Sequence, residues 1–578
     1  MAPTDQLQEV KIMLHGTAAS EGIGIGKVML IEEHSLEYTP RTVTDTEAES
    51  QRFKAAVDAF CYNTEKQAEN LRSSAGEKEA EILAGHIQII KDPYLSGEIE
   101  KLIADGQCAE SALEHMCDMF IAMFSAADDE LTKQRAADVR DIKSGVLGIL
   151  LGVNEIKVSD APKGTVLVAR ELTPSVTAGI VKENIAGIIT ETGGTTSHSA
   201  ILARALEIPA VLSVEGVASS LKNGDTVVVD GSEGAVIVNP DDNIVAEYSK
   251  KRDAFLAERK ELENYRGRET KSASGEAYEL FCNIGKPEDA VKAVDADGEG
   301  VGLFRTEFLF MDRTSIPTED EQYEAYKKAA LILKGKSLII RTLDIGGDKD
   351  IPYLGLEKEE NPFMGFRAIR YCLKNRELFK SQIKAILRAS AFGDIKIMFP
   401  LITTMDELRE GKKLVAECKA DLRNMGINFN ENIQVGVMVE TASAAVIADM
   451  LAKEADFFSI GTNDLTGYTM ACDRGNNDVS YLYSPLQPSV LRMIKRTIEC
   501  GVQNGISVGM CGEAAANKLM IPLLISFGLT EFSVSAPSVL NVRKIISTWT
   551  KEEADKVTAK VLEMSTQQEI VEYLKSVV

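Results

Sequence analysis

The chain has few of the residues that build disulfide frameworks, zinc sites or membrane spans. Its 578 residues include nine cysteines, an odd number without paired spacing, and only five histidines. This cysteine pattern argues against a disulfide framework or a zinc site. No apolar run reaches the length of a membrane span, and the acidic N-terminus with Asp5 and Glu9 lacks the form of a signal peptide. These absences predict a reduced, cytoplasmic protein without direct membrane insertion.

Positive charge is also scarce. Lys and Arg number 64 against 88 Asp and Glu, which gives a formal net charge of −24. This balance argues against nucleic acid and anionic membrane as partners and favours a basic protein partner. The length suggests three or four domains, and the 44% hydrophobic content is ordinary for globular proteins. An acidic protein that binds an anionic substrate must concentrate its arginines locally.

The first half of the chain changes pattern twice. A strand-like opening at 22–31 gives way near Thr44 to about a hundred residues of helical periodicity. Met116, Phe120 and Met123 form one of several stripes at helix spacing, and we expect these stripes to be the core of a helical bundle. His86 lies on another stripe and is expected to be a packed core histidine. Short apolar runs then return, at 165–169, 186–190, 210–212, 226–230 and 235–238. The pattern predicts a small α/β domain into which the helical bundle is inserted.

A charged segment at 243–269 separates this region from the rest and is predicted to be a solvated helical linker. Beyond it, eight strand-like segments alternate with helix-length pieces. They are 280–284, 300–304, 337–341, 395–399, 435–439, 457–460, 507–510 and 531–534. Eight strands over about three hundred residues favour a (β/α)8 barrel, with an open doubly wound sheet as the weaker alternative.

One histidine stands in a segment suited to an anion. His198 follows Gly193-Gly194 and a run of hydroxyl residues, and a helix is predicted to begin beside it, over 199–207. A phosphate on His198 would lie near helical N–H groups and the positive end of the helix dipole. The same segment also fits a plain strand-to-helix turn with His198 as a capping residue, because a short glycine loop is a weak motif.

Polar residues follow the predicted barrel strands at their carboxyl ends, where barrel enzymes place their reacting groups. Arg305 and Arg341 offer forked donors to phosphate or carboxylate, and Arg474 can join them. Glu440 and Asp464, after neighbouring strands, suit a hard divalent ion such as Mg²⁺. Any one of these residues could serve structure alone, but their joint placement at strand ends favours a site for a small, multiply charged anion.

Cys511 follows another barrel strand, where we expect it to be exposed to the mouth. A protonated thiol there could donate a proton to a carbanion or enolate. An isolated cysteine is more often a small buried hydrophobe, so this evidence is weaker.

The motifs together resemble enzyme I of the bacterial sugar phosphotransferase system, the phosphoenolpyruvate–protein phosphotransferases. The resemblance covers nearly the whole chain. It rests on Gly22-Ile-Gly-Ile-Gly26, Gly193-Gly-Thr-Thr-Ser-His198, Arg341-Thr-Leu-Asp-Ile-Gly-Gly-Asp348, Asn361-Pro-Phe-Met-Gly-Phe-Arg367, Phe458-Ser-Ile-Gly-Thr-Asn-Asp-Leu465 and Gly509-Met-Cys-Gly-Glu513. Several long motifs in the right order are highly specific.

The resemblance implies a role for each matched residue. His198 would be the phosphorylated histidine, Thr177 the support of its ring, and Cys511 the proton donor to the enolate. The implied ligands of phosphoenolpyruvate are Arg305, Arg341, Asn463, Asp464 and Arg474, and the implied ligands of Mg²⁺ are Glu440 and Asp464.

The resemblance also implies an architecture and partners. Residues 1–32 and 156–243 would form the phosphohistidine α/β domain, 33–155 the inserted helical carrier-binding domain, 244–269 the linker, and 270–578 the phosphoenolpyruvate-binding barrel. The implied partner is the phosphocarrier protein HPr, held by the helical insert. We hypothesise that the carrier docks on the helix that bears His86. A homodimer through the barrel is implied as well.

Three departures from the family pattern stand near the site. Thr441-Ala442 replaces a segment that usually holds a proline, Gly467 replaces a common glutamine, and Cys472 stands where a small apolar residue is usual. None removes a charge or a ligand, so we expect altered kinetics or loop mobility with the chemistry retained.

Two other functions fit parts of the sequence. Phosphoenolpyruvate synthase and pyruvate phosphate dikinase share the phosphohistidine and barrel parts, but they need a nucleotide-binding domain for which this chain has no residues left over. A regulatory paralogue that senses phosphoenolpyruvate and feeds a non-sugar phosphorelay remains open on sequence alone.

Overall fold

The chain divides into two compact units, Met1–Arg259 and Lys260–Val578, which are described separately. The computed structural model describes residues 12–31, 36–74, 77–126, 130–153, 158–172, 174–177, 179–194, 197–311, 313, 315–346, 351–357 and 359–578. Some of the sequence predictions fall outside these residues. They are the expected domain boundaries at 32/33 and 155/156, residues 195 and 196 of the histidine segment, and 347–349 after Arg341.

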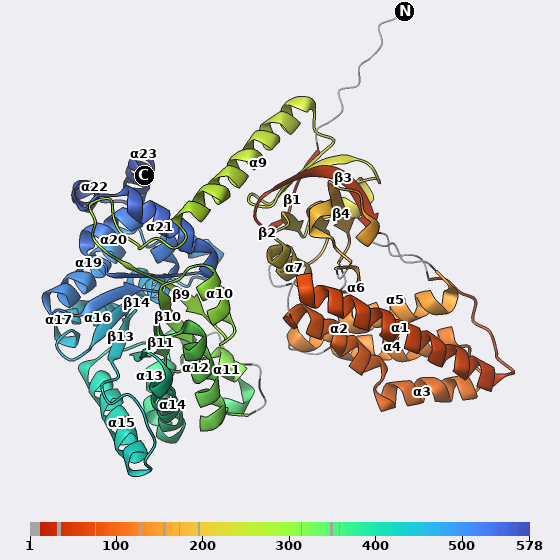
Figure 1. Cartoon of the computed structure of the whole chain (residues 1–578), viewed down its shortest axis with the longest axis horizontal. Helices are drawn as coiled ribbons and strands as arrows, with labels where there is room; N and C mark the ends of the chain where they lie inside the picture. The colour runs from red at the N-terminus through yellow and green to blue at the C-terminus, as the bar shows by residue number, and fades with distance from the viewer. Residues whose placement is uncertain are drawn as a thin grey trace, which may run out of the picture. The chain divides into compact units, whose positions relative to one another are not determined.

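The first unit contains a mixed sheet and a helical bundle (Figure 1). In the part of this unit that is described, the sheet order is β1-β8-β7-β3-β4-β5-β6-β2, with β3 to β6 parallel. Its strands are β1 (Ile12–His15), β2 (Thr17–Ser20), β3 (Ile23–Ile31), β4 (Thr165–Ala169), β5 (Ile185–Thr190), β6 (Ala210–Leu212), β7 (Thr226–Asp230) and β8 (Ala235–Val238). Residue 24 on β3 has to be a glycine for a steric reason, because a Cβ there would lie 2.0 Å from the carbonyl oxygen of Ala186.

The bundle is inserted between β3 and β4, as the sequence predicts. Its helices are α1 (Thr46–Ser74), α2 (Glu77–Ile90), α3 (Pro93–Ala104), α4 (Ala109–Ser125) and α5 (Glu130–Leu151). The short helices α6 (Pro174–Thr177), α7 (His198–Leu206) and α8 (Val217–Ser220) belong to the sheet region. His86 is a buried core histidine, as expected, and its ring nitrogens lie 3.4 Å from Asp138 and 3.7 Å from Asp141 on α5.

The stripe on α4 was only partly predicted. Met116 is buried and Phe120 is half-buried, but Met123 is 55% exposed, so its assignment to the core is wrong. Helical periodicity identifies an apolar face, and it does not show that another helix covers the whole of it. The end of α4 therefore presents apolar surface.

The linker helix α9 (Asp242–Leu262) has no buried residue, which confirms the predicted solvated helix. Within the first unit, Arg259 near its end donates a hydrogen bond of 2.6 Å to Glu207. The chain then passes through a single 3-10 turn, η3 (Glu263–Tyr265), at the start of the second unit.

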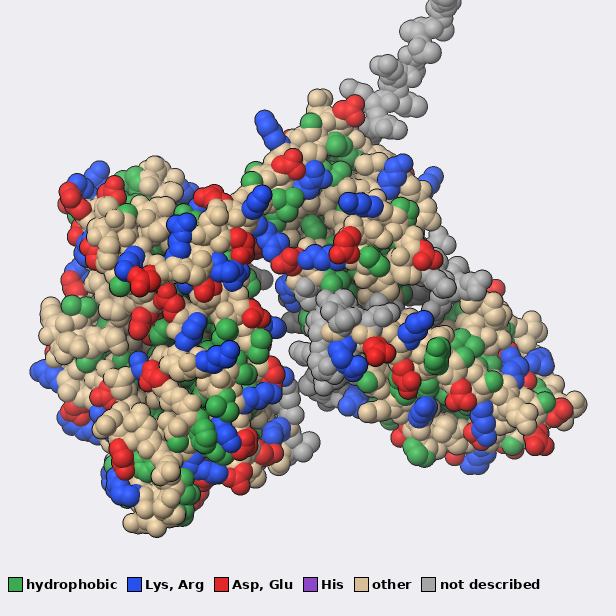
Figure 2. Space-filling view, in the orientation of Figure 1, with side chains coloured by type: hydrophobic (Ala, Val, Ile, Leu, Met, Phe, Trp, Pro, Cys, Tyr) green, Lys and Arg blue, Asp and Glu red, His purple; other side chains and the backbone are tan. Residues whose placement is uncertain are grey.

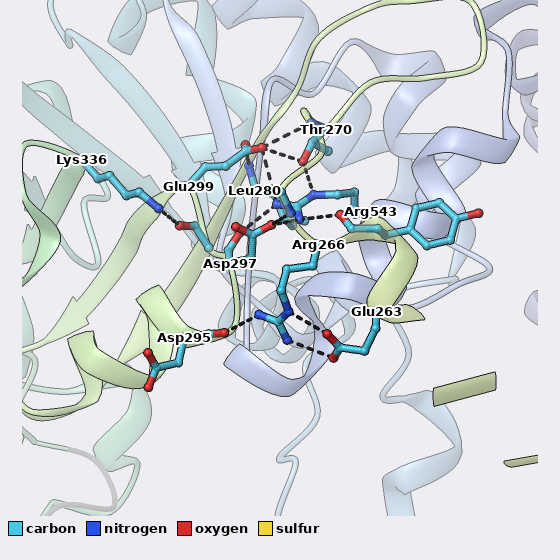
Figure 3. A network of polar contacts seen from close by, with 12 residues as sticks. Glu263, Arg266, Thr270, Leu280, Asp295, Asp297, Glu299, Lys336 and Arg543 are labelled. Carbon is cyan, nitrogen blue, oxygen red and sulfur yellow. Dashed lines mark hydrogen bonds and ion pairs between the residues drawn. The ribbon is translucent and has the colours of Figure 1, made fainter. Parts of the chain in front are cut away.

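A buried arginine ties this turn to the base of the barrel (Figure 3). Arg543 is 1% exposed, and its guanidinium donates to the Tyr265 carbonyl at 3.1 Å and to the Asp297 carboxylate at 2.5 Å. It also donates to Thr270 Oγ1 at 3.0 Å. Asp297 in turn accepts from the Gly267 backbone N–H at 2.6 Å. These residues form what we call the anchor network, and it makes residues 265–270 part of the barrel's polar base.

The second unit is a closed (β/α)8 barrel, as the sequence predicts (Figure 1). Over 260–578, where a few loop residues are left undescribed, the parallel strands close in chain order. They are β9 (Glu279–Ile284), β10 (Gly300–Arg305), β11 (Ser337–Arg341), β12 (Ile395–Phe399), β13 (Val435–Val439), β14 (Phe457–Ile460), β15 (Ser507–Met510) and β16 (Glu531–Val534). All eight runs named from the sequence fall on these strands.

Helices cover the outside of the barrel because the outward side chains of the strands are apolar. The helices are α10 (Asp289–Asp295), α11 (Phe308–Met311), α12 (Glu319–Leu333), α13 (Ala368–Lys374), α14 (Arg376–Ala389), α15 (Met405–Asn424), α16 (Ala442–Val446), α17 (Ala448–Leu451), α18 (Thr462–Met470), α19 (Pro488–Gln503), α20 (Ile521–Phe527), α21 (Val539–Thr548), α22 (Lys551–Glu563) and α23 (Gln567–Val577).

The barrel interior holds a second, smaller core and one buried acid. The inner core consists of Leu303, Ile339, Met398, Met438, Phe457 and Cys511. At the opposite end of the strands from the mouth, Glu531 is buried, and a Cβ at Gly302 would lie 2.4 Å from its Oε1. Burial, followed by the charge of Glu279, raises the pKa of Glu531 to about 8.

None of the described helices combines the length and the apolar character needed to cross a membrane. On the visible face of each unit, Lys and Arg side chains are interspersed with Asp and Glu (Figure 2). The excess of Asp and Glu therefore forms no continuous negatively charged patch on that face.

Candidate active site

The backbone places His198 at the first position of α7, after β5 and a glycine turn. Ser197 is the N-cap residue, and its Oγ accepts from the Ala200 N–H at 3.3 Å. Gly193 has φ +108°, a conformation that favours glycine. The helix thus begins at the histidine itself, one residue earlier than predicted, while the His198 side chain lies outside the described part. An anion at this turn would face the positive end of α7.

Thr177 ends the short helix α6, which packs against α7. Its side chain is buried. Helix α6 also contacts α2 and α5 of the bundle. Thr177 therefore lies on the element that joins the bundle to the helix of His198.

The second unit gathers the remaining predicted residues at one end of the barrel. Arg305 and Arg341 end the neighbouring strands β10 and β11 and are paired in register. Glu440 directly follows β13, Asp464 is in the first turn of α18 after β14, and Cys511 directly follows β15. Because the strands are parallel, all of these positions lie at the mouth.

Arg341 is buried between two acids. Its Nη2 lies 2.7 Å from Glu307 Oε1, and its Nη1 lies 3.1 Å from Asp344 Oδ2. Burial lowers the pKa of the guanidinium, but the charges of Glu307 and Asp344 outweigh burial and raise it. The guanidinium of Arg341 is therefore permanently charged, and the two acids fix its orientation inside the mouth.

Arg367 is a site residue that strand-end reasoning missed. It precedes α13, follows no strand, and reaches the mouth from the side, where its Nη2 lies 2.8 Å from Asp344 Oδ1 and 3.2 Å from Asp464 Oδ2. The signal was present, because Arg367 closes the Asn361–Arg367 motif. Asp344, which joins Arg341 to Arg367, was not singled out either, although it lies in the loop directly after β11.

Glu440 is the most deeply buried acid of the mouth that was predicted from the sequence. It is 3% exposed, and its Oε1 accepts from the Leu401 N–H at 2.6 Å. Burial, and then the charges of Asp464 and Asp344, raise the pKa of Glu440 to about 8. The local excess of carboxylate charge fits a hard divalent cation. Even so, no three His, Cys, Asp or Glu side chains of the described residues are arranged to hold a metal ion.

Two arginines and one amide residue complete the predicted set. Arg305 is exposed and stacks on the Phe308 ring, with its Cζ 5.0 Å from the centroid. Arg474 is exposed and lies 5.8 Å from the centroid of Phe363, as Arg367 does. Asn463 is next to Asp464 on α18. The structure thus brings Arg341, Glu440 and Asp464 together, with Arg305 and Arg474 on the exposed rim.

Cys511 differs from expectation in one respect. The side chain is only 7% exposed, because it packs at the top of the inner core, and its Sγ lies 3.8 Å from the Ile460 carbonyl oxygen. Expecting it to be exposed to the mouth was therefore wrong. Burial raises the pKa of the Cys511 thiol to about 12, so the thiol stays protonated at neutral pH.

Comparison with known proteins assigns a family to this architecture. The chain matches the models of PEP-utilising enzymes in three parts, the N-terminal domain at residues 15–135, the mobile domain at 161–234 and the PEP-binding domain at 259–550. A phosphoenolpyruvate-protein phosphotransferase of Bacillus subtilis (strain 168) is 46% identical over 98% of this chain and 99% of its own length. One of Staphylococcus carnosus (strain TM300) is 43% identical over 97% of this chain and 98% of its own length.

A solution structure of an Enzyme I protein, obtained by NMR, is 37% identical. It covers 42% of this chain and 99% of its own length, with a TM-score of 0.38. Because relatives that are 43–46% identical cover nearly the whole chain, the chain belongs to the phosphoenolpyruvate–protein phosphotransferase family of PEP-utilising enzymes.

Proposed function

We propose that the chain transfers the phosphoryl group of phosphoenolpyruvate to His198 and then to a histidine of the phosphocarrier HPr, as the first step of the sugar phosphotransferase system. The observation that carries this proposal is the mouth itself, where Arg341 and Arg367 converge with Glu440 and Asp464 in an acidic chain. Such a pairing of fixed cations with metal-binding carboxylates suits a substrate that carries both phosphate and carboxylate.

The domain assignment is part of the proposal. Residues 1–32 and 156–243 would carry the phosphohistidine, and 33–155 would bind the carrier. Residues 244–269 would link this region to 270–578, which would bind phosphoenolpyruvate. The reaction requires His198 to meet the barrel mouth in one step and the carrier in the next, and Thr177 would support its ring throughout.

In the first step Arg305, Arg341, Asn463, Asp464 and Arg474 would hold the substrate. Mg²⁺ bound by Glu440 and Asp464 would neutralise charge on the phosphoryl group. Neutral His198 attacks phosphorus in line, so the bond to the enol oxygen breaks as the bond to nitrogen forms. The thiol proton of Cys511 then passes to the methylene carbon, which gives pyruvate, and the thiolate regains a proton from water. The high pKa of Cys511 supports this role because the proton is present beforehand.

Carrier docking would use the helical bundle. His86 is too buried for direct contact, so a role for its helix would have to come from other side chains. Among the described residues of the bundle, α3 and α4 expose Tyr94, Met119 and Met123, and the Tyr94 ring packs edge-on against Phe120. Tyr62 on α1 is exposed as well. An exposed apolar group of this kind is typical of protein interfaces.

The decisive experiment follows the phosphoryl group from labelled phosphoenolpyruvate to HPr with His198→Ala, using His15→Ala as the control because His15 is an exposed histidine of the same unit. We expect transfer to be abolished by the first variant and unchanged in the second. Transfer by His198→Ala would refute the mechanism. Wild-type protein that releases pyruvate but leaves HPr unphosphorylated would favour the phosphoenolpyruvate-sensing paralogue.

Two further parts of the proposal concern the assembly and the location of the chain, and the first of them rests on family resemblance alone. A homodimer through the barrel is expected, and light scattering of the chain at micromolar concentration tests it. A cytoplasmic location agrees with nine free cysteines, eight of them buried.

A further inference from the structure

We infer that the barrel carries a second ligand site, a pocket beside the mouth that takes a small organic anion with an apolar body and lowers the affinity for phosphoenolpyruvate. The pocket lies between the loop after β9 and the helices α11 and α12, and its volume is about 900 Å³. This volume is within the range of pockets that hold small molecules. The regulatory part of the inference rests on the proposed function, whereas the binding part does not.

Part of the pocket lining is apolar. Phe308 and Leu309 of α11 and Leu331 and Ile332 of α12 contribute to it, together with Pro287. Leu331 is 53% exposed, on a helix whose other face is buried against the barrel. A single exposed leucine is ordinary, but apolar side chains that converge on one concave surface are typical of a ligand site.

The rest of the lining is rich in cations. The charged lining residues are Lys286, Arg313, Lys327, Lys328, Glu288 and Glu324. Four cations against two acids reverse the balance of the whole chain, which has 64 Lys and Arg against 88 Asp and Glu. Because a local excess of cations attracts negative charge, the pocket favours an anion over a neutral molecule of the same shape.

The ion pairs around the pocket are weak enough to open for such an anion. Lys328 pairs with Glu288, and these side chains are 55% and 62% exposed. Lys327 lies 3.4 Å from Glu324, which is 64% exposed. Exposed pairs contribute little to stability, so a lysine can exchange its glutamate for the charged group of a ligand at small cost.

The short segment 305–309 joins this pocket to the mouth. Arg305 ends β10, and its Cζ lies 5.0 Å from the centroid of the Phe308 ring at the start of α11. Glu307, between them in the chain, lies 2.7 Å from Arg341. A ligand that contacts Phe308 in the pocket therefore contacts the ring on which Arg305 stacks. Displacement of this ring would move a proposed ligand of phosphoenolpyruvate, so we expect the two molecules to weaken each other's binding by the same factor.

The binding test compares two fluorescent probes on the full chain. 8-Anilinonaphthalene-1-sulfonate is an apolar anion, and N-phenyl-1-naphthylamine has the same aromatic body without the charge. We expect the sulfonate to bind the wild type several-fold more tightly than the neutral probe. Leu331→Glu, which adds a carboxylate to the pocket, should weaken sulfonate binding at least about tenfold. Leu256→Glu is the control, because Leu256 on α9 is also 53% exposed, and it should bind the sulfonate as the wild type does.

A second pair of variants tests the charge. Lys328→Met removes one cation of the pocket and should weaken sulfonate binding several-fold while leaving the neutral probe unaffected. Lys556→Met is its control, because Lys556 also forms an exposed ion pair, with Glu552 at 2.7 Å, but on α22. Equal sulfonate affinity in the wild type, Leu331→Glu and Lys328→Met would overturn the site.

The regulatory part is tested by pyruvate release. The sulfonate should raise the KM of the wild type for phosphoenolpyruvate up to a plateau and should not affect Leu331→Glu. A rise without a plateau that persists in Leu331→Glu would place the sulfonate at the mouth and refute the regulation. If the chain releases no pyruvate from phosphoenolpyruvate at all, the proposed function fails, and the fluorescence titrations still decide whether the pocket binds the anion.

Discussion

Glu207, the residue that ends the helix begun by His198, accepts a hydrogen bond of 2.6 Å from Arg259 on the linker helix. Glu207 has φ +54°, and Lys182 lies 3.0 Å from its other oxygen. These side chains are about half exposed, so each ion pair contributes about 0–1 kcal/mol. The contact is therefore weak enough to open and close readily.

The weak contact predicts a local effect of Arg259→Met. The melting temperature should fall by a few degrees at most, because an exposed pair is lost. Hydrogen exchange over 255–262 should speed up, since α9 has no buried residue to hold its end. Lys251→Met, which removes an ion pair with Glu247 inside the same helix, is the control and should leave exchange at 255–262 unchanged.

Replacing Arg543 should have a much larger effect on stability. Arg543→Met leaves Asp297 and the Tyr265 carbonyl without their buried partner, and the expected cost is about 3–5 kcal/mol of unfolding free energy. Arg543→Lys keeps the positive charge but loses the several donors of the guanidinium, so its loss of unfolding free energy should be smaller than that of Arg543→Met. Lys544→Met breaks a partly exposed pair with Glu261 and should cost less than about 1 kcal/mol. Urea unfolding measures all three, and equal losses at both positions would contradict the anchor network.

Glu531 should make the barrel less stable as the pH rises. Its carboxyl has a pKa of about 8 in the folded chain, whereas the ordinary pKa of a glutamate is 4.5, so between these pH values the folded chain keeps a proton that the unfolded chain loses. Stability from this group is present below pH 4.5 and is lost as the pH rises through 8. Glu531→Gln should therefore raise the melting temperature at pH 8 and have little effect near pH 4.5. A stabilisation of equal size at both pH values would refute the ionisation argument.

The cysteines should differ sharply in reactivity. Cys511 is buried with a pKa of about 12, whereas Cys472 is the one cysteine of the nine that is not buried. Because the thiolate is the reactive form, a maleimide at pH 7.5 should label Cys472 first and Cys511 very slowly. Peptide mapping by mass spectrometry gives the order, and in urea all nine should react alike. Rapid labelling of Cys511 in the folded chain would contradict its burial.

Gly512 should be needed for activity because it packs against Thr462 at the start of α18. A Cβ at Gly512 would lie 1.9 Å from Thr462 Oγ1 and 2.7 Å from the Thr462 backbone nitrogen. Gly512→Ala must therefore shift the start of α18, which carries Asn463 and Asp464, and pyruvate release should fall at least about tenfold. Gly97→Ala is the control, because nothing lies within 4 Å of a Cβ there. Full activity of Gly512→Ala would show that the site tolerates this shift.

The sequence predicted the barrel strands because their buried runs are separated by helix-length segments, and the mouth followed from their ends. It did not predict that Arg341 and Arg367 both pair with Asp344. Arg367 follows no strand, and the packing of Gly346 against it brings it to the mouth. The burial of Cys511 and the exposure of Met123 were also missed, because each depends on what covers a residue.

The departures at the mouth have local explanations. Thr441 starts α16, where its Oγ1 accepts from the Ala444 N–H at 3.1 Å and donates to the Ile402 carbonyl at 3.0 Å. Gly467 and Cys472 meet at the end of α18, and a Cβ on Gly467 would lie 3.3 Å from the Cys472 carbonyl oxygen. None of the three departures alters the charge at the mouth.

The position of Arg543 has a consequence for where the chain can be divided. A fragment that begins after residue 270 would lack the Tyr265 carbonyl and the Gly267 N–H, which are partners of Arg543 and Asp297. Both charges would then remain in the floor of the barrel with fewer bonds, at a cost the isolated barrel must bear. We therefore expect a barrel expressed on its own to be more stable when it includes residues 265–270, which supply these hydrogen bonds.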